Sequence, residues 1–248
     1  MRSPGKKKYP SFVVLLLTYP LTGFGEDASA FQKDQTDTGL IARMQWESRY
    51  VSEGRDNLDN SGIQTTSVDL KGSHFGLSIW NGWGYVSEYD ELQLTPSFTH
   101  ELNNLDIYIY YNYKHYLKED ESENELGSGF SYRGLPCKIS LNGDWYYSLE
   151  NNGSFYKFSI ASYFSPVEKF TLNPVLVFGI NDNYIPDGHN GANNVGIQLN
   201  AGYQMTKHLN LLGYVRYNIA IDSDQEQYPG DRLLNDFYWI GVGIETEF

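Results

Sequence analysis

The sequence predicts an all-β fold, a closed antiparallel barrel of about twelve strands with up-and-down topology. Apolar residues recur at every second position along most of the 248-residue chain, which is the side-chain period of a β-strand. Long polar connections alternate with short ones along the chain. Aromatic residues make up 16% of the chain, with 21 Tyr and 24 Gly, and this composition favours strands and turns over helices.

Residues 1–25 differ from the rest of the chain. Arg2 and a run of three Lys precede the apolar stretch FVVLLLTYPL, and the small residues of GFG follow at 23–25. This order indicates a secretory signal peptide, which is too short to span a membrane as a helix. A second cleavage site, ASA at 28–30, lies further from the apolar stretch. We therefore expect a signal peptide at 1–25, an N-terminal segment at 26–39 and the barrel at 40–248.

The mature chain is strongly acidic. Removing the four basic residues of 1–25 from the 18 in the chain leaves 14 against 31 acidic residues, a net formal charge of −17. This charge excludes nucleic acid and anionic membrane surfaces as partners. The single cysteine, Cys137, excludes an internal disulfide, and we expect it to be an apolar residue within a strand.

The alternation is clear in the first expected strand, where Leu40, Ala42, Met44 and Trp46 are apolar and the residues between them are polar. Such a strand has one apolar and one polar face. The expected strands lie near residues 40–52, 63–70, 74–80, 90–99, 104–114, 124–132, 135–147, 154–164, 169–180, 194–205, 208–220 and 232–248.

Connections after the odd-numbered strands are long and polar, whereas those after the even-numbered strands are short. Strands joined in this way have all short turns at one rim and all long loops at the other, which is typical of bacterial outer-membrane barrels. In hydrocarbon a sheet must close, because an open edge would leave backbone groups unpaired. The sequence thus predicts a transmembrane barrel in the outer membrane with 26–39 in the periplasm, its apolar side chains contacting outer-membrane lipid.

Tyrosines near the strand ends suit the level of the lipid headgroups. The expected set is Tyr50, Tyr113, Tyr163, Tyr203 and Tyr217. A soluble β-sandwich is the alternative, since it also has strands with a period of two residues. A sandwich does not require long and short connections to alternate, and it needs no signal peptide.

The chain ends on the apolar alternation YWIGVGIETEF. This segment resembles the C-terminal signal by which the barrel insertion machinery recognises outer-membrane barrels, with an aromatic last residue and apolar residues at alternate positions before it. The matching residues are Phe248, Ile244, Val242, Ile240 and Tyr238, and Thr246 departs from the pattern. We also expect this last strand to pair with the first and close the ring.

The segment WESRYVSEG at 46–54 resembles the first-strand motif of the TorF-like putative porins, through Ser48, Arg49, Tyr50 and Gly54. The chain length and strand number are similar to those of the twelve-stranded oligogalacturonate-specific porins and related sugar-acid channels. These resemblances imply a porin, a passive diffusion channel for small hydrophilic solutes such as sugars or sugar acids.

Strand phase predicts which charged side chains line the lumen. A barrel of about twelve strands leaves a narrow channel, between the filled interior of eight strands and the wide channel of sixteen. Charged groups there would orient or select solutes, or would simply pair with each other. The candidates are Arg43, Glu47, Arg49, Asp106, Lys138, Asp144, Lys157, Arg216 and Glu245.

No catalytic or cofactor motif is evident, and we expect no enzyme activity. The acidic run 118–125 is expected to be a solvated loop, with divalent cation binding as the alternative. DSDQEQYPGDRL departs from a calcium loop at Gln227 and Leu233. A non-conducting barrel with a structural or adhesive role is the second hypothesis. A lipid hydrolase is the third, but strand phase places Ser97 and His100 on opposite faces.

Overall fold

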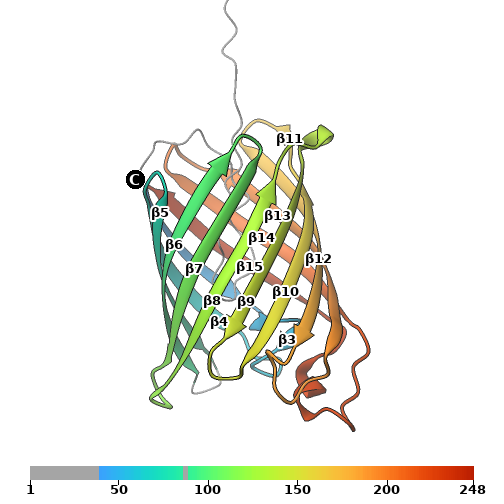
Figure 1. The fold of residues 1–248 in the computed structure, drawn as a ribbon. Coiled ribbons are helices and arrows are strands. Elements are labelled where there is room, and N and C mark those ends of the chain that lie inside the picture. The colour runs from blue at the N-terminus through green and yellow to red at the C-terminus, as the bar shows by residue number, and fades with distance from the viewer. Residues whose placement is uncertain (1–38, 86–88) are drawn as a thin grey trace, which may run out of the picture.

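A computed structural model of the protein describes residues 39–85 and 89–248. The expected signal peptide, and the expected periplasmic segment except for its last residue, lie outside the described residues. Within the described residues the chain folds into one antiparallel sheet that closes on itself (Figure 1).

Twelve long strands form the wall, as the sequence predicts. They are β1 (Gly39–Glu47), β4 (Ile63–Lys71), β5 (Phe75–Gly84), β6 (Asp90–Leu102), β7 (Leu105–Tyr116), β8 (Glu121–Tyr132), β9 (Ile139–Ser148), β10 (Gly153–Ser162), β12 (Phe170–Asp182), β13 (Gly191–Gln204), β14 (Leu209–Ala220) and β15 (Phe237–Glu247). A short strand, β11 (Phe164–Val167), pairs with β12 at one rim.

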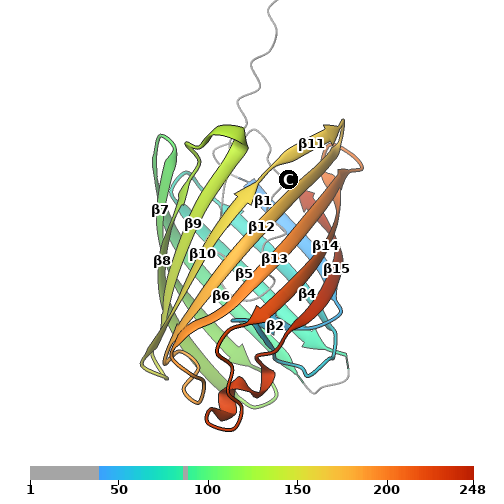
Figure 2. The ribbon, with the colours of Figure 1, turned by 90° about the vertical axis from the view of Figure 1, so that its right-hand side faces the viewer.

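Sequential strands are neighbours around the ring, which closes through two pairings. The first strand pairs with the last, with Met44 opposite Ile244, and β10 pairs with β12, with Phe158 opposite Phe178. Both views of the side of the barrel show strands inclined to its axis (Figures 1 and 2). The closed up-and-down barrel and the pairing of its terminal strands are therefore confirmed.

The two rims differ as predicted, but some of the expected long loops are short. The connections at 117–120 and 149–152 have only four residues each, because the flanking strands continue to pair. Tyr116 lies opposite Glu121 in the ladder between β7 and β8. The acidic run 118–125 is therefore not a solvated loop throughout. Its second half belongs to β8, and Glu125 is only 2% exposed.

Three expected strands are shorter than predicted by four or five residues at one end. The first ends at Glu47, and the chain then turns into the barrel as a hairpin formed by β2 (Val51–Ser52) and β3 (Arg55–Asp56). The seventh begins only at Ile139, after the short 3-10 helix η1 (Pro136–Lys138). The last begins at Phe237, after a second 3-10 helix, η2 (Pro229–Leu233). Proline starts both 3-10 helices, where its missing N–H is not needed.

Apolar side chains lie on the outside of the barrel and polar ones on the inside, the reverse of a soluble protein. Exposed residues of the strands are mostly Leu, Ile, Val, Phe and Tyr, whereas the fully buried ones include Arg216, Gln93, Gln198 and Glu91. The expected alternation in β1 is confirmed, because Met44 and Trp46 are exposed while Gln45 and Glu47 are buried. An apolar outer wall around a polar interior is the arrangement that lipid requires of a transmembrane barrel.

Aromatic rings inside the wall lie over glycines of the neighbouring strand. A Cβ atom added to Gly241 would lie 2.1 Å from the Tyr214 ring, and one added to Gly127 would lie 2.0 Å from Tyr110. Glycine is therefore required there by the close approach of a ring. The glycine at position 241, in the last strand, thus leaves room for the Tyr214 ring inside the barrel.

Two of the five expected headgroup tyrosines do not face lipid. Tyr203 and Tyr217 are exposed on the outer wall, whereas Tyr50 is buried inside the barrel and Tyr163 is buried beside η1. Tyr50 turns inward because the first strand ends before it. None of the helices in the described part of the chain has the length and apolar character needed to cross a membrane.

Candidate functional site

The lumen is lined by polar side chains from all around the ring. Each of these side chains has an exposed fraction below one tenth and lies on the inward face of a strand. They include Gln45, Thr65, Gln93, Thr95, Asn112, Ser131, Ser140, Asn173, Gln198, Asn200 and Asn218. Many are joined to each other, as in the 2.9 Å bond from Thr95 Oγ1 to Asn112 Oδ1. Hydrogen bonding offsets the cost of removing such groups from bulk water.

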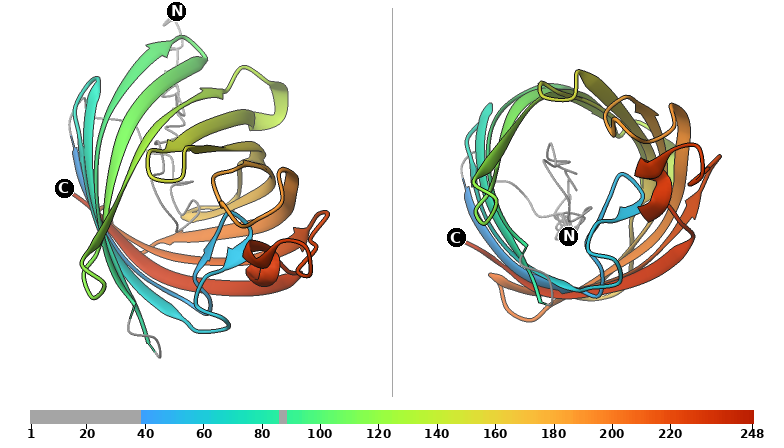
Figure 3. Two further views of the ribbon diagram at one scale, coloured as in Figure 1. Left: turned by 60° about the horizontal axis from the view of Figure 1, so that its bottom comes forward. Right: turned by 90° about the horizontal axis from the view of Figure 1, so that it is seen from below.

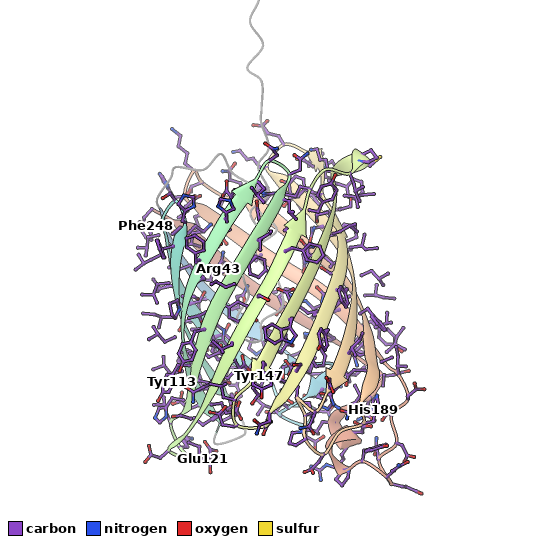
Figure 4. All side chains as sticks on the ribbon, in the orientation of Figure 1. Arg43, Tyr113, Glu121, Tyr147, His189 and Phe248 are labelled. Atoms are coloured by element: carbon purple, nitrogen blue, oxygen red, sulfur yellow. The ribbon has the colours of Figure 1, made fainter. Side chains whose placement is uncertain are left out.

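Arg43 and Glu245 lie opposite each other in the half of the lumen nearer the rim of short turns (Figure 4). Arg43 Nε donates to Glu245 Oε2 at 2.7 Å, and Arg43 Nη1 donates to Asp69 on the other neighbouring strand. Asn210 Nδ2 donates to the second oxygen of Glu245 at 3.0 Å. The guanidinium is thus held between two carboxylates, and its charge is compensated within the wall.

Arg216 lies on the inward face of β14 and is 2% exposed. Its guanidinium stacks over Tyr214, with 4.0 Å from Cζ to the ring centroid, and lies 5.9 Å from the Trp239 ring. Arg216 Nε and Nη2 have no hydrogen-bond partner among the described residues. Cation–π contacts therefore orient this guanidinium, and two of its donors are left for another acceptor.

The other predicted lumen residues on the wall strands do not form one cluster, and each has its own neighbours. Asp106 pairs with Arg133, with 2.5 Å between Oδ2 and Nη2, and Tyr108 donates to Asp144. Lys157 lies opposite Asp144 in the ladder between β9 and β10. Glu47 is buried on β1 beside the β15 backbone.

Arg49 and Lys138 lie outside the wall strands. Arg49 pairs with Asp56 of the hairpin, and its Cζ lies 5.2 Å from the Phe237 ring centroid. Lys138 is in η1 rather than in a strand, where it is exposed and its Nζ lies 5.4 Å from the Tyr163 ring centroid. The strand expected from residue 135 was wrong at its start, so strand phase misplaced Lys138. Cys137 is also exposed in η1 and is not a strand residue.

A second cluster of charged side chains lies on β6, β7 and β8 and consists of Glu91, Lys114 and Glu125. Lys114 Nζ donates to Glu125, and both residues bond the Tyr184 hydroxyl, which lies 3.1 Å from the Lys114 nitrogen. Glu91 accepts from Tyr50 at 2.9 Å and from Gln93 at 2.7 Å. Lys114 lies on the same strand face as Asp106, so the period of two residues that predicted an inward Asp106 also predicts an inward Lys114. Tyr184 and Tyr50 lie in connections and carried no such signal.

The hairpin of β2 and β3 occupies the lumen near the rim of long loops. Seen along the barrel axis, it lies inside the ring of strands next to η2 (Figure 3). Every residue from 50 to 56 is buried. Its turn requires a left-handed backbone at Glu53 and at Gly54, where φ is 45° and 71°. A Cβ on Gly54 would also lie 2.7 Å from Asn194, so glycine is needed there on two counts.

Arg55 holds the hairpin against the outer loops. Its Nη2 donates to Asp231 Oδ1 at 2.9 Å and its Nε donates to the Gly230 carbonyl at 2.9 Å. The other oxygen of Asp231 lies 2.7 Å from His189 Nδ1. Burial lowers the pKa of Arg55, and the Asp231 and Glu53 carboxylates oppose that change.

Glu53 is a buried carboxyl at the tip of the hairpin. Tyr146 on β9 donates to its Oε1 at 2.8 Å. Burial raises the pKa of Glu53 from 4.5 to about 7, while Lys114 and hydrogen bonds from Ser52 and Tyr146 lower it. Among the described residues Glu53 forms no ion pair within 4 Å. Its charge state therefore changes near neutral pH.

The last strand ends at the rim of short turns (Figure 4). Phe248 lies at the rim of short turns, whereas Glu121 and His189 lie at the opposite rim (Figure 4). Tyr238, Ile240, Val242 and Ile244 are exposed on the outer wall with Phe248. Their recognition by the insertion machinery stays a prediction.

The residues considered for other chemistry do not come together. Ser97 lies on the inward side of β6, and His100 is exposed on the opposite side. Within residues 39–85 and 89–248, no three His, Cys, Asp or Glu side chains are grouped so that they could hold a metal ion.

No protein-family model matches the sequence, and no curated protein matches it. Among solved structures, the KdgM porin is similar to this chain with a TM-score of 0.58 at 10% identity, over 84% of this chain and 99% of that one. The NanC porin gives 0.55 at 11% identity, over 84% and 98%. An outer-membrane channel from Pseudomonas putida F1 gives 0.56 at 10% identity, over 87% and 97%.

Identities this low show a shared fold. The resemblance of Ser48, Arg49, Tyr50 and Gly54 to the TorF-like motif stays a prediction. The first three residues lead into the hairpin, and Gly54 lies in its turn. The expected likeness in architecture is confirmed: the chain has the fold of the KdgM and NanC porins, a closed twelve-stranded transmembrane β-barrel of the bacterial outer-membrane type.

Proposed function

We propose that this protein is an outer-membrane porin, a passive diffusion channel for small hydrophilic solutes, with sugars and sugar acids as the favoured class. The observation that carries the proposal is the wall of buried polar and charged side chains inside a barrel whose outside is apolar. Twelve strands suit a channel that is narrow enough to contact a solute.

Arg216 supports the choice of sugar acids. Its two unpartnered donors would suit a carboxylate, because a guanidinium binds that group through parallel N–H bonds. The Tyr214 and Trp239 rings beside it offer apolar faces on which a sugar ring packs. A solute must first reach this group, because Arg216 is only 2% exposed and the hairpin residue Val51 belongs to the same buried cluster as Tyr214 and Trp239.

Conductance of the purified full chain in a planar bilayer tests the proposal. Stepwise current is expected, together with a partial block by a uronic acid that weakens in Arg216→Gln. Arg232→Gln is the matched control, because Arg232 is exposed in the outer loop. A bilayer that incorporates folded protein and stays silent would refute the channel. A block that is equal in both variants would refute the role of Arg216.

The second candidate is a non-conducting barrel with a structural or adhesive role. The hairpin in the lumen favours it, since residues 50–56 are buried there and are bonded to several walls. A silent barrel that remains silent after the hairpin is shortened would support this candidate. The Ser97 and His100 arrangement gives no support to lipid hydrolysis.

A further inference from the structure

The hairpin crosses the lumen from one side of the ring to the other. It leaves the wall at the end of β1, and Glu53 at its tip bonds Tyr146 on β9. Counted around the closed ring, β9 is the sixth strand from β1 in both directions. A segment that contacts opposite walls restricts the passage between them.

Further hydrogen bonds attach the hairpin to other sectors of the ring. Tyr50, just before it, donates to Glu91 on β6 at 2.9 Å. Asn218 on β14 donates to the Gly54 carbonyl at 2.9 Å, and Asn193 on β13 donates to the Glu53 carbonyl at 2.7 Å. The hairpin is therefore docked in one position.

The contact at Glu53 differs from these hydrogen bonds because the Glu53 carboxyl, with its pKa raised to about 7, changes its charge near neutral pH. Its carboxyl is buried and is held by neutral hydroxyl donors. Lys114, a cation of the wall whose charge acts on Glu53, is already bonded to Glu125. An ionised Glu53 would add a further carboxylate to this part of the mouth. The titratable and charged groups facing Glu53 are Tyr110 and Lys114 on β7, Glu125 on β8, Tyr146 on β9, Tyr184 in the outer loop and Arg55 on β3.

We propose that the hairpin of residues 51–56 is a gate over the extracellular mouth, docked while Glu53 is neutral and released when Glu53 ionises. The gate rests on the proposed channel function, because only a conducting barrel has a passage to restrict. Docking of the hairpin, by contrast, does not depend on whether the barrel conducts.

The difference between the Glu53 pKa in the docked hairpin and its ordinary value determines how docking depends on pH. Glu53 has a pKa of about 7 in the docked hairpin against an ordinary value of 4.5. Docking is therefore at full strength below about pH 4.5 and weakens as the pH rises through about 7. The two values correspond to a loss of docking affinity on the order of 100-fold at alkaline pH.

The first experiment compares conductance at about pH 5 and about pH 9 for the parent, Glu53→Gln and Glu119→Gln. The parent is expected to conduct more at the higher pH. Glu53→Gln removes the charge but keeps the hydrogen bond with Tyr146, so this variant should remain in the low-conductance state at both pH values. Glu119 is exposed in the turn after β7, and its variant should follow the parent. A Glu53→Gln profile that matches the parent overturns the gate.

A covalent lock gives an independent test. Arg55 forms an isolated antiparallel bridge with Leu234, so cysteines at the two positions are suitably placed for a disulfide. In a Cys137→Ser background, oxidised R55C/L234C should stay in the low-conductance state at about pH 9, although Arg55→Cys removes the bonds to Asp231 and Gly230. Parent-like conduction in the oxidised barrel would contradict the proposal.

A labelling experiment separates failure of the gate from failure of the channel. Ser52 is buried in the docked hairpin. Ser52→Cys in the Cys137→Ser background should react with an impermeant maleimide faster than S52C/E53Q at about pH 9, and equally at about pH 5. Comparison at the same pH cancels the intrinsic reactivity of the thiol. This result in a silent barrel would support release while refuting the channel, whereas equal rates at both pH values would overturn the gate.

Discussion

Arg43 on the first strand and Glu245 on the last strand form an ion pair across the seam at which the barrel closes, with 2.7 Å between Nε and Oε2. The two residues are also directly opposite each other in the ladder between β1 and β15. Asp69 on β4 binds the same guanidinium from the other side. One arginine therefore links three adjacent strands, of which β15 is 202 residues away in the sequence at Glu245.

Arg43→Met should weaken closure of the barrel. It removes a cation from between two carboxylates that are poorly exposed, so the cost is about 1–3 kcal/mol in the free energy of unfolding. The measurement is urea unfolding in lipid vesicles. A double-mutant cycle with Glu245→Gln isolates the pair, because Asp69 remains in both backgrounds. Additive effects in this cycle would show that the seam does not depend on this contact.

The contact of Tyr214 with Gly241 predicts a second effect on stability. Gly241→Ala would place a methyl group 2.1 Å from the ring, so the ring or the strand must shift at a cost of about 1–3 kcal/mol. Gly213→Ala is the matched control on the neighbouring strand, since the nearest atom would lie 3.9 Å away. Thermal unfolding of the two variants should differ. Equal stabilities would mean that Tyr214 leaves its position easily.

Much of the fold could be predicted because a transmembrane strand must alternate. Each of the twelve strands shows the period of two residues that lipid on one side and the lumen on the other impose. The errors lie where that constraint ends. Cys137 and Lys138 continue an apparent alternation beyond the true strand, and Pro136 shows why, since it begins a 3-10 turn instead.

The lumen charges were predictable for the same reason, and the hairpin was not. Arg43, Arg216 and Glu245 follow from phase alone. Glu53 and Arg55 lie in a connection, where no period relates sequence to direction. Their positions depend on partners distant in sequence, Tyr146 and Asp231, and such pairings leave no local pattern.

Phe248 combines two features that can be separated. Its backbone N–H donates to the Leu40 carbonyl at 2.9 Å and so contributes to the seam. Its side chain is 73% exposed at the rim of short turns and belongs to none of the buried clusters in the described part of the chain. The ring therefore contributes little to the stability of the folded barrel.

Phe248→Ala should impair assembly in cells and leave the assembled barrel nearly unchanged. The substitution keeps the backbone bond and removes only the exposed ring, so the free energy of unfolding should change by less than about 0.5 kcal/mol. The amount of heat-resistant folded barrel in outer membranes should fall, while refolding into vesicles and conductance remain at the parent level. Phe75→Ala is the matched control, because Phe75 is 71% exposed at the same rim but lies away from the C-terminus. If both variants assemble equally well in cells, or if Phe248→Ala fails to refold in vitro, the terminal aromatic residue is not a recognition signal.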